Sequence, residues 1–216
     1  MASRDYAKPP AAHSSELRRA IDRWPSVAVA DVVAAIAHGA IGQRRADHVT
    51  PYIDHPRLAA TLILRWNDAN VIALDDGALE RCVAGALLHD VLEDTKLPRA
   101  ELHAQFPGRR ALIALVERMT EPPGEPDAPR YYRRIAEDRE AVIVKCADRC
   151  ANLEDVLKDV RRGEGIDRWR RYITKTRRDV LPILRDDALE RELLLRIEEI
   201  DASLPFYDEQ SAERGR

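Results

Sequence analysis

An acidic, histidine-containing segment, GALLHDVLEDT at residues 85–95, carries side chains whose types and spacing suit metal chemistry. Its apolar run ends on His89 and Asp90, and Glu93 and Asp94 follow one helical turn later. Because residues four apart lie on one face of a helix, Glu93 is expected a turn beyond His89, and Asp94 a turn beyond Asp90. An imidazole and a carboxylate at a helix end can bind one cation together. The segment therefore predicts half of a metal site.

The remaining ligands have to come from elsewhere in the chain. Three of the six histidines lie in polar or charged segments: His13, His48 and His103. This leaves His38 and His55, and we prefer His55 because the segment PYIDHP places it at a helix start, next to Pro56. His55 is therefore the third predicted ligand.

A second acidic candidate is Asp148, in the segment AVIVKCADRCANLEDV, with Asn152 four residues later on the same helical face. An Asp on the buried side of a helix is costly unless it is paired or binds a metal. Two imidazoles and two carboxylates suit a divalent transition ion such as Mn²⁺ better than calcium or a structural zinc. Glu93 and Asp94 would then be free for proton transfer in a hydrolase.

Simpler explanations exist for each fragment taken alone. A His-Asp pair at a helix end is commonly a cap or a surface salt bridge, and Lys145 and Arg149 are positioned to neutralise Asp148 as an ordinary ion pair. The joint pattern of the segments is what favours the functional interpretation.

The joint pattern resembles the hydrolase domain of the RelA/SpoT family, within the HD phosphohydrolase superfamily. The matching pieces occur in family order over about residues 27–160: GQRR, PYIDHP, ALLHDVLEDT, FPGRRALIALVERMT and KCADRCANLEDV. The combination of HD-x-x-ED with Tyr-x-x-His-Pro and Ala-Asp-Arg-x-x-Asn rarely arises by chance. The resemblance implies an all-α HD-domain helical bundle.

The resemblance also implies an activity and a set of site residues. Family members use Mn²⁺ to remove the 3′-pyrophosphate from guanosine tetra- and pentaphosphate alarmones, giving GDP or GTP and pyrophosphate. By matching motif, the metal ligands are His55, His89, Asp90 and Asp148, and Glu93 and Asp94 are the pair that handles water and protons. The residues matching substrate contacts are Arg45, Asn152 and Arg168. Too few residues follow Asp159 for the family's synthetase domain, so a small hydrolase-only form is expected.

Departures from the family pattern leave the substrate open. Ala46 stands where relatives commonly carry Lys, and Ala151 where they carry His or Tyr. These positions surround the base and ribose in the family's site, so adenosine alarmones or another nucleotide such as NADPH are alternative substrates. The pattern also does not decide which of three arginines contacts phosphate: Arg130, Arg133 or Arg134. A third alternative is a non-catalytic nucleotide-sensing or antitoxin-like module, although a pure binder does not require Glu93 and Asp94.

The elements that must position these residues are predicted to be helical. Apolar residues at helical spacing follow a Ser26 cap after Pro25 and give a buried face of Val29, Val32, Val33, Ile36, Ala37 and Ala40. Similar patterns cover residues 58–63, 79–87, 112–119 and 131–157, and two helices fill roughly 166–201 with Pro182 ending or kinking the first. No strand pattern of useful length occurs.

Length and composition indicate one main domain. The 216 residues are 45% hydrophobic, and we expect a polar extension at 1–24, the hydrolase domain at 25–203 and a polar tail at 204–216. A formal charge of −3 disfavours general nucleic-acid binding. The basic cluster RRGEGIDRWRRY leaves a tRNA contact as an alternative, although a solvated helix face is the simpler explanation of this cluster.

The chain is expected to be soluble and cytoplasmic, because no signal peptide or membrane span is found. Its three cysteines are expected in the core. The partner is a small-molecule nucleotide, and the oligomeric state is open.

Overall fold

The computed structural model describes residues 13–121, 128–161 and 165–203. Within these residues the helices are joined by loops and there is no strand, so the predicted all-α fold is confirmed. It divides into two compact units, Met1–Glu125 and Pro126–Arg216. None of the described helices is both long and apolar enough to cross a bilayer.

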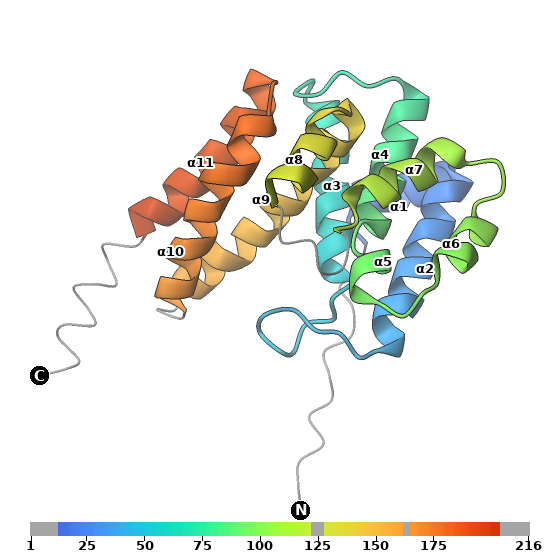
Figure 1. Cartoon of the computed structure of the whole chain (residues 1–216), viewed down its shortest axis with the longest axis horizontal. Helices are drawn as coiled ribbons and strands as arrows, with labels where there is room; N and C mark the ends of the chain where they lie inside the picture. Colours follow the sequence, from blue (N-terminus) through green and yellow to red (C-terminus); the bar gives the residue numbers. More distant parts are fainter. Residues whose placement is uncertain (1–12, 122–127, 162–164, 204–216) are drawn as a thin grey trace, which may run out of the picture. The chain divides into compact units, whose positions relative to one another are not determined.

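The first unit is built around α4, which packs against α2, α3 and α7 (Figure 1). Residues Cys82 to Leu88 of α4 are almost entirely inaccessible to solvent, so α4 carries the centre of this core. The helices of the unit are α1 (Ser15–Arg23), α2 (Pro25–Ala40), α3 (Asp54–Asp68), α4 (Asp76–Leu88), α5 (Val91–Asp94), α6 (Arg99–Gln105) and α7 (Arg110–Met119).

The second unit is built around α9, the longest helix among the described residues, against which α8, α10 and α11 pack. Its elements are α8 (Ala128–Ala136), α9 (Arg139–Arg161), α10 (Ile166–Lys175), a π-helical turn η1 (Thr176–Val180), a 3₁₀ turn η2 (Leu181–Ile183) and α11 (Asp187–Ser203). Pro182 lies in η2, where the chain leaves regular helix, as predicted.

Residues 15–23, which the sequence analysis assigned to a polar extension, form α1. Ser14 caps this helix by accepting a hydrogen bond from the Leu17 backbone N–H, and Leu17 and Ala20 are buried. Because only two apolar positions face inward, the apolar pattern of this charged segment is too weak to predict a helix. The rest of the predicted extension, residues 1–12, and the tail at 204–216 lie outside the described residues.

The buried face of α2 differs from the prediction. Val29, Val32 and Ile36 are exposed, whereas the buried apolar positions are Val27, Ala30, Ala34 and Ala37. Because both faces of α2 are apolar, the periodicity could not identify the inner one. The alanine-rich face lies inward, and its small side chains allow α2 to approach α4 closely.

The predicted Ser26 cap is also wrong. The helix starts at Pro25, Trp24 precedes it without a side-chain cap, and the Ser26 hydroxyl donates instead to Glu80 Oε1 at 2.6 Å.

Candidate metal centre and active site

His89 lies where α4 ends. Its Nδ1 is 2.8 Å from the carbonyl oxygen of Ala86, and the side chain is almost fully buried. A carbonyl can only accept a hydrogen bond, so Nδ1 carries the proton and Nε2 presents its lone pair. This is the arrangement by which histidines that bind metals are usually oriented.

The sequence predicts one helix that runs through His89 to Asp94, but the structure has a break there. α4 ends at Leu88, and Asp90 adopts φ −99° and ψ −5°, outside the usual helical values, before the single turn of α5. The Asp94 N–H still bonds to the Asp90 carbonyl at 2.8 Å. The bend therefore separates His89 and Asp90 from a regular helical face while keeping Asp94 one turn beyond Asp90.

His55 lies in the first turn of α3, as predicted, and is 1% exposed. Its ring centroid is 5.2 Å from that of His89, and each ring offers a nitrogen within 4.8 Å of the other. Asp90 Oδ2 lies 2.9 Å from His89 Nε2 and 3.8 Å from His55 Nε2. Three predicted ligands of the first unit are therefore brought together.

The chemistry of these donors fits a divalent cation. With the proton of His89 on Nδ1, the Nε2 lone pair faces a carboxylate oxygen, so two electron-rich atoms meet. A cation between them, or a second proton on the imidazole, resolves that repulsion. Nitrogen and carboxylate oxygen donors suit transition ions.

Tyr52, at the loop before α3, is a site residue for which the sequence analysis assigned no role. Its hydroxyl donates to Asp90 Oδ2 at 2.5 Å, and its ring lies against those of His38 and His55. The hydrogen bond fixes the Asp90 carboxylate. The signal was available in the Tyr-x-x-His-Pro pattern, where Tyr52 precedes His55 by three residues.

Glu93 and Asp94, the predicted catalytic pair, lie on α5 with exposed side chains. Glu93 Oε2 accepts from the Glu121 backbone N–H at 2.9 Å. Asp94 Oδ2 accepts from Gln43 Nε2 at 2.8 Å. Both carboxylates are thus held in place and open to solvent, as proton transfer to a substrate requires.

Arg45, a predicted substrate contact, lies in the loop between α2 and α3 and is mostly buried. Its backbone N–H donates to Thr50 O at 2.9 Å, beside an isolated bridge between Arg44 and Pro51. Asp47 closes this turn. Burial would raise the pKa of Asp47, but hydrogen bonds from Thr50 and Val49 outweigh it and lower the pKa to about 2.

Asp148, the predicted ligand of the second unit, lies buried on α9. Lys145 Nζ is 2.8 Å from its Oδ2, and Asn152 Nδ2 donates to its Oδ1 at 2.8 Å. The helical pairing of Asp148 with Asn152 is as the spacing suggested, and Lys145 supplies the ion pair of the simpler explanation. Arg149 does not: it donates to Tyr132 and Thr176 and stacks on Tyr172 at 4.5 Å.

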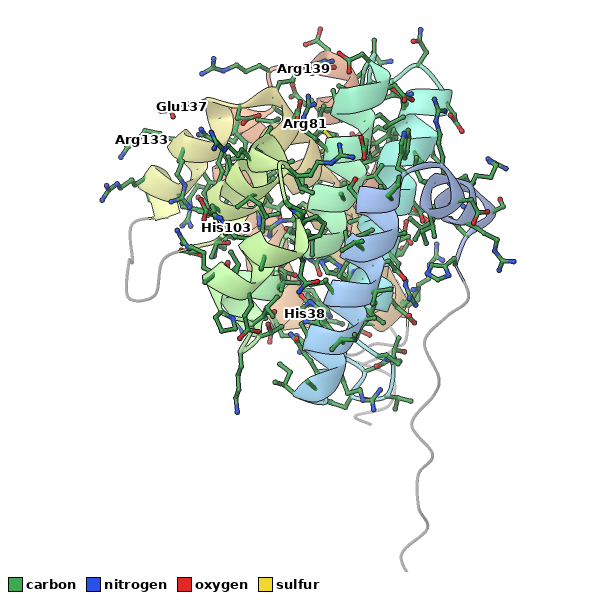
Figure 2. The ribbon with its side chains drawn as sticks, turned by 90° about the vertical axis from the view of Figure 1, so that its right-hand side faces the viewer. His38, Arg81, His103, Arg133, Glu137 and Arg139 are labelled. Carbon is green, nitrogen blue, oxygen red and sulfur yellow. The ribbon has the colours of Figure 1, made fainter. Side chains whose placement is uncertain are left out.

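The other predicted phosphate contacts lie on α8 and α10. Arg168 Nη2 is 3.4 Å from Asp159 Oδ2, and its guanidinium stacks on Trp169 at 4.1 Å. On α8, Arg133 extends from the ribbon into solvent (Figure 2), and Arg134 lies over the Tyr131 ring at 5.6 Å.

Comparison with known proteins finds a family model that matches the residues of this site. Residues 52–153 match the HD domain. The match covers a little under half of the chain. The matched range contains the paired His89 and Asp90, and also His55, Glu93, Asp94, Asp148 and Asn152. Arg45 and Arg168 lie outside the matched range.

Two similar proteins extend the comparison beyond the HD domain. Guanosine-3′,5′-bis(diphosphate) 3′-pyrophosphohydrolase MESH1 of Danio rerio is 28% identical over 127 residues, which are 57% of this chain and 65% of that protein. The match thus spans less than two thirds of the relative. A solved structure of a metazoan orthologue of SpoT that hydrolyses ppGpp superposes with a TM-score of 0.58 at 21% identity, covering 88% of this chain and 97% of that one. This second likeness concerns the fold.

Proposed function

We propose that this chain is a cytoplasmic, metal-dependent hydrolase that removes the 3′-pyrophosphate of guanosine tetra- and pentaphosphate. The products are GDP or GTP and pyrophosphate. The observation that carries the proposal is the meeting of His55, His89 and Asp90 inside an HD domain, with Glu93 and Asp94 on the adjoining turn. The activity named for the Danio rerio relative supports the choice of substrate.

Four side chains would hold the metal ion in this proposal. His55, His89 and Asp90 lie close together, and Asp148 is the fourth ligand that the family pattern implies. The proposed ion is Mn²⁺, with another divalent transition metal as the alternative. Such an ion supplies Lewis acidity toward water and phosphoryl oxygens.

The chain's own residues would bind the substrate and move protons. Glu93 or Asp94 accepts a proton from the attacking water, whose oxygen bonds to the phosphorus attached to O3′. The bond between that phosphorus and O3′ breaks, and O3′ takes up a proton as pyrophosphate leaves. Arg45, Asn152 and Arg168 are the proposed substrate contacts, and Arg130, Arg133 and Arg134 are further candidates for balancing phosphate charge.

A substrate panel tests this proposal. Guanosine and adenosine alarmones and NADPH are incubated with Mn²⁺ and then with chelator, and the products are separated by chromatography. We expect GDP and pyrophosphate from guanosine tetraphosphate, and no product after chelation. Orthophosphate release, or turnover of an adenosine alarmone or NADPH alone, would favour the alternatives suggested by Ala46 and Ala151.

The same assay separates an enzyme from a nucleotide-binding module. Asp94→Ala should abolish hydrolysis while nucleotide binding persists, because Asp94 is exposed and lies outside the proposed ligand set. Asp167→Ala, at an exposed position on α10, is the control. A wild-type protein that binds nucleotide without hydrolysing any substrate of the panel would point to the binding module.

A further inference from the structure

A chain of hydrogen bonds connects the end of α2 with the proposed catalytic carboxylate. His38 Nδ1 lies 2.6 Å from Gln43 Oε1, and Gln43 Nε2 lies 2.8 Å from Asp94 Oδ2. Figure 2 shows His38 on the last turns of α2. All three residues belong to the first unit, so the chain of bonds is a property of that unit alone.

The direction of each hydrogen bond in this chain follows from elementary chemistry. An ionised carboxylate only accepts hydrogen bonds, so Gln43 must turn its amide NH₂ toward Asp94. Its carbonyl oxygen then faces His38, which must donate from Nδ1. One orientation of Gln43 therefore satisfies both neighbours, whereas the reverse orientation would turn its carbonyl oxygen toward the Asp94 carboxylate, where neither atom can donate.

His38 is suited to the donor role. It is 1% exposed, and its Nε2 has no hydrogen-bond partner among the described residues, so the ring proton is favoured on Nδ1, where Gln43 accepts it. Burial lowers the pKa of His38, and the opposing effects of Gln43 and Asp90 do not cancel this. A neutral ring with a single, directed N–H results.

The ring of His38 is also held in place. Its centroid lies 4.8 Å from that of Tyr52, whose hydroxyl donates to Asp90. The side chain that begins the hydrogen-bond chain to Asp94 therefore packs against the side chain that orients the proposed metal ligand. Gln43 itself is partly exposed and follows Gly42, whose φ of 65° turns the chain out of α2.

We propose that His38 and Gln43 are positioning residues that fix the Asp94 carboxylate in its reactive orientation, an inference that rests on the proposed function. Neither residue touches the reacting atoms. A carboxylate that moves protons must stay within hydrogen-bond reach of its target, and the amide of Gln43 restricts the rotation of Asp94. Loss of these hydrogen bonds should then lower kcat and leave substrate binding largely intact.

Gln43→Met tests the second link, because Met keeps the length of the side chain and removes its donor and acceptor. We expect kcat with guanosine tetraphosphate and Mn²⁺ to fall about 10- to 100-fold, the usual effect of losing an orienting partner, with KM within about twofold. Gln105→Met is the matched control on the exposed end of α6 and should leave both constants unchanged.

Two variants of His38 separate hydrogen bonding from packing. His38→Asn keeps an N–H near the position of Nδ1 and loses the ring, whereas His38→Phe keeps a ring and loses the donor. If His38 acts by positioning Gln43, His38→Asn should have a higher kcat than His38→Phe, even though His38→Phe should unfold at the higher temperature. Packing alone predicts that kcat follows thermal stability.

The outcomes are distinct. An active wild-type enzyme whose kcat is unchanged by Gln43→Met, or a higher kcat for His38→Phe than for His38→Asn, overturns this inference alone. A wild-type protein that hydrolyses nothing in the presence of Mn²⁺ overturns the proposed function together with it.

Discussion

At the scale of single residues, Asp31 is the one carboxylate on α2, and it faces inward. Arg57 Nε and Nη2 donate to its two oxygens at 2.8 and 2.9 Å, and His13 Nε2 lies 2.8 Å from Oδ2. Burial would raise the pKa of Asp31, but the hydrogen bonds and charges of Arg57 and His13 outweigh it and lower the pKa. Asp31 therefore stabilises the folded state when it is ionised.

Asp31→Asn should lower the free energy of unfolding by about 1.5–3 kcal/mol at pH 7, as expected for hydrogen bonds to a charged group. Because the folded-state pKa lies below the ordinary value of 3.8, the wild-type advantage is complete above that pH. It should disappear as the pH falls below 3.8 and through the folded-state pKa. Urea unfolding between pH 2 and 7 measures it.

Asp167→Asn, whose carboxylate is 85% exposed, is the control and should change the free energy of unfolding little at any pH. An Asp31→Asn effect of constant size down to pH 2 would contradict the proposed role of the ionised carboxylate.

Some of the site residues could be predicted from the sequence, and others could not. His55, His89 and Asp90 were predictable because their residue types and spacing are specific, and the structure brings them together. The roles of Tyr52, Gln43 and His38 depend on where their side chains point, which periodicity does not encode. The sequence favours His55 over His38 as a ligand, and the connection of His38 to Asp94 through Gln43 depends on the folded arrangement of the three side chains.

Among the helices, α2 has two apolar faces, of which one is exposed and the other is buried. Val32 is 55% exposed, whereas Ala34 is fully buried. Val32→Glu should therefore change the free energy of unfolding by less than about 0.5 kcal/mol. Ala34→Glu buries an unpaired charge and should cost about 3–5 kcal/mol or prevent folding.

Circular dichroism and urea unfolding of the two Glu variants provide the measurement, and each variant is the matched control of the other. The face predicted from periodicity would give the opposite order, because it places Val32 inside. Equal destabilisation by both substitutions would contradict the orientation of α2 in the structure.

Helices were predictable as a class, and their ends and orientations less so. The patterns at 79–87 and 112–119 correspond to α4 and α7, because each has one clearly apolar face or is apolar all round. α1 was missed because it is short and charged, and the bend at His89 and Asp90 carries no Gly or Pro to announce it. Such features are decided by tertiary packing rather than by local propensity.

For the whole molecule, the proposed metal site draws on residues that are far apart in the sequence, from His55 to Asp148. The division between the two compact units lies in the proline-rich segment TEPPGEPDAP, most of which is outside the described residues. The predicted single hydrolase domain at 25–203 remains a proposal.

Metal removal should therefore lower thermal stability. An ion at about 100 times its dissociation constant stabilises the folded state by about 2.7 kcal/mol, which corresponds to roughly 5–10 °C in Tm for a chain of this size. Differential scanning calorimetry with Mn²⁺ and with chelator measures this shift. His89→Ala and Asp148→Ala should each abolish it, and an unchanged shift in either variant would contradict that residue's role as a ligand.

The three cysteines, Cys82, Cys146 and Cys150, are all without solvent exposure. A thiol reagent can reach them only when the surrounding helices open, so the rate of alkylation in native buffer reports on transient unfolding events. Cys82 lies in the first unit and the other two in the second, which gives each half of the chain its own reporter. A cysteine introduced at an exposed position would react first, so a fluorophore can be attached there without removing the native sulfur atoms.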